Sequence, residues 1–156
     1  MGFYGVDPIH FGSVSMVTTS LGKNDPEPGT LRQEGDEEYI FVYNTGSNAQ
    51  INPGHCAVLS GVTGYSVTVS SISLDLAVGV CKHATIVTGG YGWLVRRGFT
   101  SVEMGANYSC AVGELLEIGV DGVFDTASNT TGNAGYVAKA MTAAASGASC
   151  DAYVKF

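Results

Sequence analysis

Alternating apolar and polar side chains over short stretches predict a chain of short strands. Residues 38–44 (EYIFVYN) carry apolar side chains on both faces, which is typical of a strand buried on both sides. Residues 64–73 place Tyr65, Val67 and Val69 on one face and hydroxyl side chains on the other, as in a half-exposed antiparallel strand. Further short strands are expected within 55–59, 114–118 and 149–156, with turns between them. This spacing predicts a mainly β fold, a small antiparallel barrel or sandwich.

The stretch 88–99 (TGGYGWLVRRGF) predicts a strand over 92–97 with glycine at both ends. Tyr91 and Trp93 share one face of that strand, and Arg96 lies on the other. Gly98 is expected to turn the chain, which would make 92–104 a hairpin. The single tryptophan is interpreted as a core anchor, with ligand stacking as the alternative. The candidates for core anchoring or contact are Tyr91, Trp93, Arg96 and Arg97.

The alanine-rich segment 136–145 fits two predictions. Its propensity favours a helix. It lacks the stripe of large apolar residues that a packed helix shows, and the alternating segment 149–156 needs a strand to pair with. We therefore favour a pair of strands.

Residues 1–33 differ from the rest of the chain. They contain prolines at 8, 26 and 28 and no sustained hydrophobic period. We interpret them as an extended N-terminal arm and loop, followed by a β-rich domain over 34–156, because isolated apolar residues outside a core mark contact surfaces. The predicted capsid or inter-subunit contacts in this arm are Phe3, Tyr4, Ile9, Phe11, Val14, Met16 and Val17.

Composition narrows the functional classes. The chain has 156 residues, 13% charged residues and a net charge of −7. Nucleic-acid binding is not expected, because it requires a basic stripe and the basic residues are scattered. The same charge argues against an anionic membrane surface. With no apolar run of ~20 residues and no leader-like N-terminal segment, assembly in the cytosol is expected.

Candidate chemistry is sparse. No familiar catalytic or nucleotide-binding fingerprint is present, so we expect no enzymatic activity, no catalytic residue, no cofactor and no metal. The acidic residues of 25–38 are interpreted as a solvated segment rather than a metal loop. Glu114 and Glu117 lie three apart on a predicted strand, so they would face opposite sides rather than form a glycosidase pair.

Four cysteines lie at positions 56, 81, 110 and 150. In a reducing compartment they are expected to be buried thiols. A Cys₂His₂ zinc site built from His55–Cys56 and Cys81 with His83 is the alternative, although its spacing matches no zinc module. A hydrolase that uses these histidines and cysteines is a further alternative to a non-enzymatic role.

The order of several short motifs resembles the small decoration (cement) proteins of tailed-phage capsids. The resemblance covers roughly residues 30–156, and each motif alone has low specificity. The motifs are Leu31-Arg32-Gln33, 39–44 (YIFVYN), Asn52-Pro53-Gly54, 90–95 (GYGWLV) with the return through Gly98, 112–116 (VGELL), the alanine-rich 135–145, and Ser146-Gly147.

The resemblance implies a structural virion protein on the exterior of an expanded capsid. Its partners would be the major capsid protein, whose capsomers it cements, and itself, as a homotrimer. It also implies a small barrel or β-tulip-like sandwich with an arm that reaches a neighbour. The alternative is a glycan-binding, adhesin-like β module of a virion, in which exposed Tyr91 and Trp93 would form the sugar platform.

Overall fold

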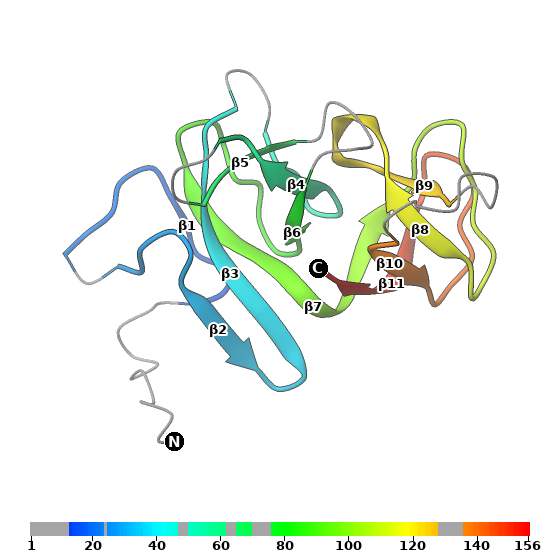
Figure 1. The fold of residues 1–156 in the computed structure, drawn as a ribbon, viewed down its shortest axis with the longest axis horizontal. Coiled ribbons are helices and arrows are strands. Elements are labelled where there is room, and N and C mark those ends of the chain that lie inside the picture. Colours follow the sequence, from blue (N-terminus) through cyan, green and yellow to red (C-terminus); the bar gives the residue numbers. More distant parts are fainter. Residues whose placement is uncertain (1–12, 24, 47–49, 62–64, 70–75, 128–135) are drawn as a thin grey trace.

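A computed structural model of the chain describes residues 13–23, 25–46, 50–61, 65–69, 76–127 and 136–156. The fold is mainly β, as predicted (Figure 1). Within the described residues no helix is long and apolar enough to cross a membrane. The elements are β1 Val17–Thr18, β2 Leu31–Glu34, β3 Glu37–Asn44, β4 Cys56–Leu59, β5 Ser66–Val69, β6 Ala77–Cys81, β7 Tyr91–Glu103, β8 Leu115–Ile118, the 3₁₀ turn η1 Val120–Gly122, β9 Phe124–Thr126, β10 Ala138–Ala140 and β11 Ser149–Lys155.

Strand pairing closes the first part of the chain into a ring. β3 pairs with β5, β5 with β4, β4 with β6, β6 with β7, and β7 pairs back with β3. Only the β3–β5 pair among these is parallel. β2 extends the ring as an antiparallel partner of β3. A closed ring of this kind leaves its strands without free backbone edges at the point of closure.

The second part is an open sheet that shares β7 with the ring. From Arg97 onward, β7 pairs antiparallel with β11, from Arg97↔Lys155 to Glu103↔Ser149. The sheet continues through β10, β8 and β9. In Figure 1, β7 runs from the half that contains β3 to the half that contains β8–β11. The predicted hairpin over 92–104 is therefore wrong, because Gly98 bends one continuous strand and does not reverse it.

Two hydrophobic cores lie on opposite faces of the ring strands. One contains Ile40, Val42, Val67 and Leu94, and draws on all five ring strands, so it fills the ring. The other contains residues that alternate with these and extends over the open sheet; its members include Tyr39, Phe41, Trp93, Leu116 and Val154. The prediction that 38–44 is buried on both faces is confirmed, because Tyr39 to Val42 are each at most 2% exposed.

The alanine-rich tail forms a short strand. β10 lies between β8 and β11, as the favoured prediction of a strand pair requires. Ala138 and Ala140 face the core, where their small side chains fit closely against the neighbouring strands. The strand ends at Ala140, because the backbone N–H groups of Met141 and Thr142 both turn to the carbonyl of Asp151. Tertiary pairing therefore overrides the helical propensity of the segment.

The described part of the predicted arm packs on its own domain. Val14 is 8% exposed and belongs to the core, Met16 packs against that core, and Val17 in β1 pairs with Gly92 of β7. The predicted boundary between residues 33 and 34 falls inside β2. The remaining predicted arm contacts lie outside the described residues: Phe3, Tyr4, Ile9 and Phe11.

Candidate interaction surface

Trp93, the single tryptophan of the chain, lies in the core, as its interpretation as a core anchor requires. It is 3% exposed, and its ring is tilted against Phe41 at a centroid distance of 5.0 Å. Tyr91 is half-buried. Its ring stacks on Phe41 at a centroid distance of 6.2 Å and is tilted against Tyr43 at a centroid distance of 4.7 Å. Because Trp93 is covered, Tyr91 and Trp93 do not present an exposed platform on which a sugar could stack.

The two predicted arginines lie on opposite sides of β7. Arg96 is half-buried; it pairs with Glu38 at 3.3 Å and donates to the backbone carbonyl of Phe156 at 3.5 Å. Arg97 is exposed, and its Nε donates to the hydroxyl oxygen of Tyr153 at 3.1 Å. Arg96 therefore connects Phe156 to the ring strand β3, and the side chain of Arg97 lies in solvent.

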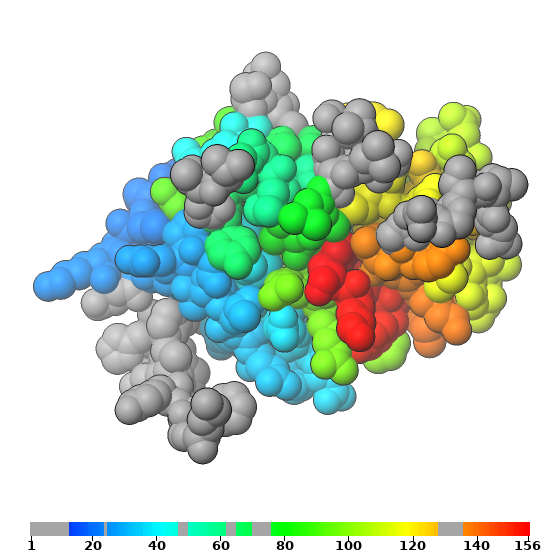
Figure 2. Space-filling view, viewed as in Figure 1, coloured from blue at the N-terminus to red at the C-terminus, as the bar shows by residue number. Residues whose placement is uncertain are grey.

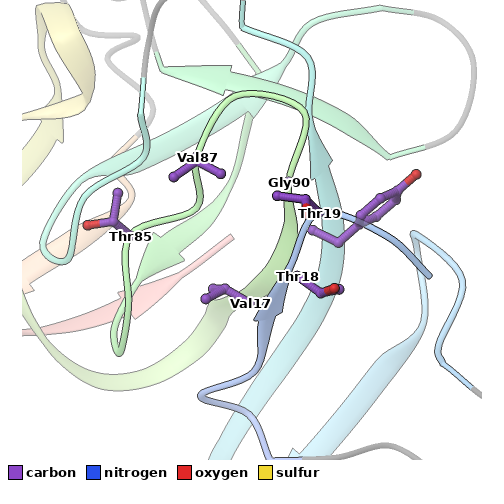
Figure 3. Close-up of a pocket in the computed structure, with 7 residues that line it drawn as sticks. Val17, Thr18, Thr19, Thr85, Val87 and Gly90 are labelled. Carbon is purple, nitrogen blue, oxygen red and sulfur yellow. The ribbon is translucent and has the colours of Figure 1, made fainter. Parts of the chain in front are cut away.

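A hollow of about 360 Å³ lies between β1 and the segment that leads into β7 (Figure 3). Val17 and Val87, which line it, are 42% and 39% exposed. Its remaining lining residues are threonines 18, 19 and 85 with Gly90 and Tyr91. This lining has no charged side chain, so the hollow can hold an apolar side chain but offers no acid–base chemistry.

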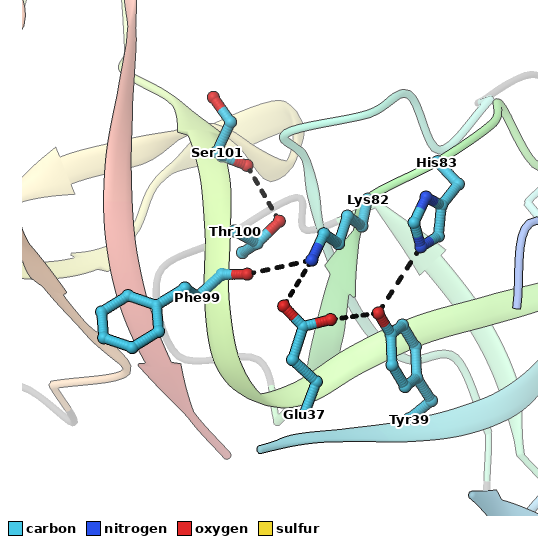
Figure 4. A network of polar contacts seen from close by, with 7 residues as sticks. All are labelled: Glu37, Tyr39, Lys82, His83, Phe99, Thr100 and Ser101. Atoms are coloured by element: carbon cyan, nitrogen blue, oxygen red, sulfur yellow. Dashed lines mark hydrogen bonds and ion pairs between the residues drawn. The ribbon is translucent and has the colours of Figure 1, made fainter. Parts of the chain in front are cut away.

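A polar cluster ties the start of β3 to the bend in β7 (Figure 4). The carboxylate of Glu37 accepts hydrogen bonds from the Lys82 ammonium and the Tyr39 hydroxyl. The same ammonium donates to the backbone carbonyl of Phe99 at 3.3 Å, and the Tyr39 hydroxyl lies 3.5 Å from Nε2 of His83. Lys82 therefore connects β3 with the strand just beyond Gly98.

The cluster shifts the ionisation of two of its members. Burial alone would raise the pKa of Glu37, but the hydrogen bonds from Lys82 and Tyr39 outweigh burial and lower this pKa. Burial, together with the hydrogen bond to Glu37, raises the pKa of Tyr39. Glu37 is thus held as a carboxylate and Tyr39 as a neutral phenol, so the cluster acts as a structural tie.

Replacing Lys82 by methionine is expected to lower the unfolding free energy at neutral pH by roughly 1.5–3 kcal/mol, the range for a hydrogen bond to a charged group. Because the folded pKa of Glu37 is lowered, the carboxylate stabilises the fold above its ordinary pKa of about 4.3, and this contribution is lost as pH falls through the folded value. Urea unfolding should therefore separate wild type from Lys82→Met most at neutral pH and least in strong acid. Lys139→Met is the matched control, and an equal difference at every pH would contradict the role given to Glu37.

The structure does not bring the residues of the alternative Cys₂His₂ zinc site together. His55 instead ties β4 to the end of β7, with Nε2 3.0 Å from the Glu103 carboxylate and Nδ1 3.0 Å from the Asp121 carbonyl. Cys56 and Cys81 lie in different cores, and burial raises the pKa of Cys81 to about 12. Over the residues that the structure describes, no group of three or more His, Cys, Asp or Glu side chains is placed to hold a metal ion.

The open sheet presents one face to solvent, which we call the open face. Cross-strand pairing aligns Phe99 with Tyr153, Tyr153 with Lys139, and Lys139 with Leu115, so one row crosses four strands. In the space-filling view, the red C-terminal strand lies at the surface beside the orange segment of β10 (Figure 2). The open face consists of Arg97, Phe99 and Ser101 of β7, Asp151, Tyr153 and Lys155 of β11, Lys139 of β10, and Leu115 and Glu117 of β8.

Aromatic side chains form the centre of the open face. Phe99 is 54% exposed and meets Tyr153 edge-to-face at a centroid distance of 5.1 Å. Beside this pair, a hollow of about 350 Å³ separates β7 and β11 from the β2–β3 hairpin, which contributes Gln33, Asp36 and Glu38 to its lining. The face therefore combines an exposed apolar centre with a polar margin, as protein interfaces do.

Of the residues of this face, sequence reasoning predicted only Arg97 as a contact. It placed Phe99 on the returning strand of a hairpin and gave no role to Tyr153, Lys139 or Lys155. The alternation within 149–156 does indicate that Tyr153 and Lys155 share one side. The pairing of β11 with β7, which brings Tyr153 next to Phe99, is a contact between distant parts of the chain and has no local signal.

Comparisons with known proteins place the fold. No protein-family model matches the sequence, and no curated protein matches it significantly. Among solved structures, the fold is similar to that of the head fibre gp8.5 N base of bacteriophage phi29, with a TM-score of 0.50 and 12% sequence identity. The match covers 75% of this chain and 92% of that chain. At this identity the likeness shows a shared fold.

Proposed function

We propose that this chain is a structural protein of a phage virion, which binds the exterior of the head shell and cements neighbouring capsomers. One observation carries the proposal: the fold matches almost the whole length of a base domain from a phage head fibre. The motif order that resembles decoration proteins supports the same class independently of the fold. The chain is acidic and has few charged residues, which fits a role based on surface burial.

Cementing would combine many equivalent contacts. Each buried Å² of apolar surface contributes roughly 25 cal/mol, while ordering a flexible segment costs about 1–2 kcal/mol per residue in backbone entropy. A modest net binding energy per copy then becomes a large stabilisation over a whole shell. We further propose that the copies act as trimers, each bound to the major capsid protein and to one another.

Deleting residues 1–12 is expected to leave a folded domain that binds shells roughly tenfold more weakly, a loss of about 1.4 kcal/mol. The deletion stops at residue 12 because Val14 lies in the core and β1 pairs with β7. The measurement is co-sedimentation of the purified protein with expanded, empty heads of the phage that encodes it, with circular dichroism to check folding.

The full-length chain is the reference in that assay. A full-length chain that fails to bind the heads, or that leaves their heat resistance unchanged, would overturn the cementing role. Full binding by the deletion variant would instead show that the N-terminal segment does not contact the shell. The folded domain would then mediate binding by itself.

A further inference from the structure

We propose that the open face is the docking surface of this protein and that its partner is an acidic protein surface with an apolar centre, located on the head shell. This inference rests on the proposed function, since it assigns the partner chemistry of the same attachment. It concerns the folded domain and is independent of the N-terminal segment.

The centre of the face supplies the apolar part of the interface. Phe99, which is 54% exposed, pairs with Tyr153 across β7 and β11, and Leu115, which is 40% exposed, lies at the other end of the row beyond Lys139. Large apolar side chains gathered on one sheet face mark interaction sites more strongly than scattered ones do. Aromatic side chains are also the residues that most often dominate binding energy at interfaces.

Basic side chains of the open face lie opposite each other on neighbouring strands. Lys155 lies directly opposite Arg97 across β11 and β7, and like charges in that position destabilise a sheet. Arg97 faces the carboxylates of Glu38 and Asp36 near the hollow. Neither Lys155 nor Lys139 forms an ion pair within the part of the chain that the structure describes. A partner carboxylate near Lys155 would offset its repulsion from Arg97, and a partner carboxylate near Lys139 would gain a charge-assisted contact.

The charge of the face also opposes that of the whole chain. Arg97, Lys139 and Lys155 are three of the seven basic residues, while the chain carries a net charge of −7. With Asp151 and Glu117 included, the five charged residues of the face sum to +1, while the carboxylates of Asp36 and Glu38 lie at its edge beside Arg97. The positive charge of the face is therefore concentrated at Lys139 and Lys155, and an acidic partner is repelled least at these two lysines, which orients docking.

The test compares matched charge reversals in the co-sedimentation assay with empty heads. Lys155→Glu and Lys139→Glu are each expected to weaken binding roughly tenfold at low salt, while the exposed Lys23→Glu, with the same change in net charge, should stay within about twofold of wild type. Wild-type affinity should fall as NaCl rises, and this dependence should be flatter in Lys155→Glu. Phe99→Ala should weaken binding without changing the salt dependence.

A second measurement requires no substitution. Acetylation of lysines by a water-soluble reagent, read by peptide mass spectrometry, should modify Lys139 and Lys155 in the free protein and spare them on the shell, while Lys23 reacts in both states. If all three lysines react equally on the shell, or if the three charge-reversal variants bind equally, the open face is not the docking surface. The proposed function would stand in that case. Wild-type protein that does not bind heads would overturn the proposed function and this inference together.

Discussion

Replacing Trp93 by alanine is expected to lower the unfolding free energy by about 3–5 kcal/mol, the range for removing a large aromatic side chain from a core. Trp93 is 3% exposed and packs against Phe41, so its removal leaves a cavity in the core that joins the ring to the open sheet. A loss of this size is a large fraction of the stability of a small domain. Urea unfolding measured by far-ultraviolet circular dichroism gives the value.

Two further variants isolate the cause. Phe99→Ala removes an aromatic side chain from the same strand at a position that is 54% exposed, and should cost no more than about 1 kcal/mol, the range for its cross-strand pair with Tyr153. Trp93→Phe should cost less than Trp93→Ala, because phenylalanine keeps a six-membered ring in the core and Nε1 of Trp93 has no hydrogen-bond partner among the described residues. Equal effects of Trp93→Ala and Phe99→Ala would contradict the buried position of Trp93.

Most of the correct predictions about the fold came from the alternation of neighbouring side chains between the two faces of a strand. Tyr39 and Phe41 alternate with Ile40 and Val42, and the two pairs do lie in two different cores. The strands expected within 55–59 and 114–118 are also present, as β4 and β8. These features could be predicted because successive side chains of a strand point to opposite faces, so neighbouring residues alone show the pattern.

Pairing between distant strands could not be predicted in this way. The ring depends on the parallel contact of β3 with β5 and on the return of β7 to β3, and neither has a sequence signature of its own. The open face depends in the same way on β11 lying beside β7. Phe99 and Tyr153, 54 positions apart in the sequence, become neighbours only through that pairing. The sequence therefore indicated a mainly β structural protein but not the surface we now assign to docking.

Gly98 was predicted to be a turn and is the residue that lets one strand serve both halves of the molecule. Its φ is +132°, a region that favours glycine, and a Cβ added there would meet Cγ of Glu37 at 2.8 Å and its Cα at 3.2 Å. Gly98→Ala is therefore expected to combine backbone strain, roughly 1–3 kcal/mol, with displacement of Glu37 from Lys82. Gly113→Ala is the matched control, because Gly113 has φ of +90° but open space around the added Cβ.

The difference between the two variants measures the close approach alone. Gly98→Ala should lose more stability than Gly113→Ala in urea unfolding, and combining it with Lys82→Met should cost less than the sum of the two single changes, because both act on Glu37. Equal losses for the two glycine variants would show that only the backbone angle matters at Gly98. If the losses of unfolding free energy from Gly98→Ala and Lys82→Met add fully, the Glu37 cluster and the bend at Gly98 are independent. The bend in β7 would then depend on strand pairing and not on the contact of Lys82 with Glu37 and Phe99.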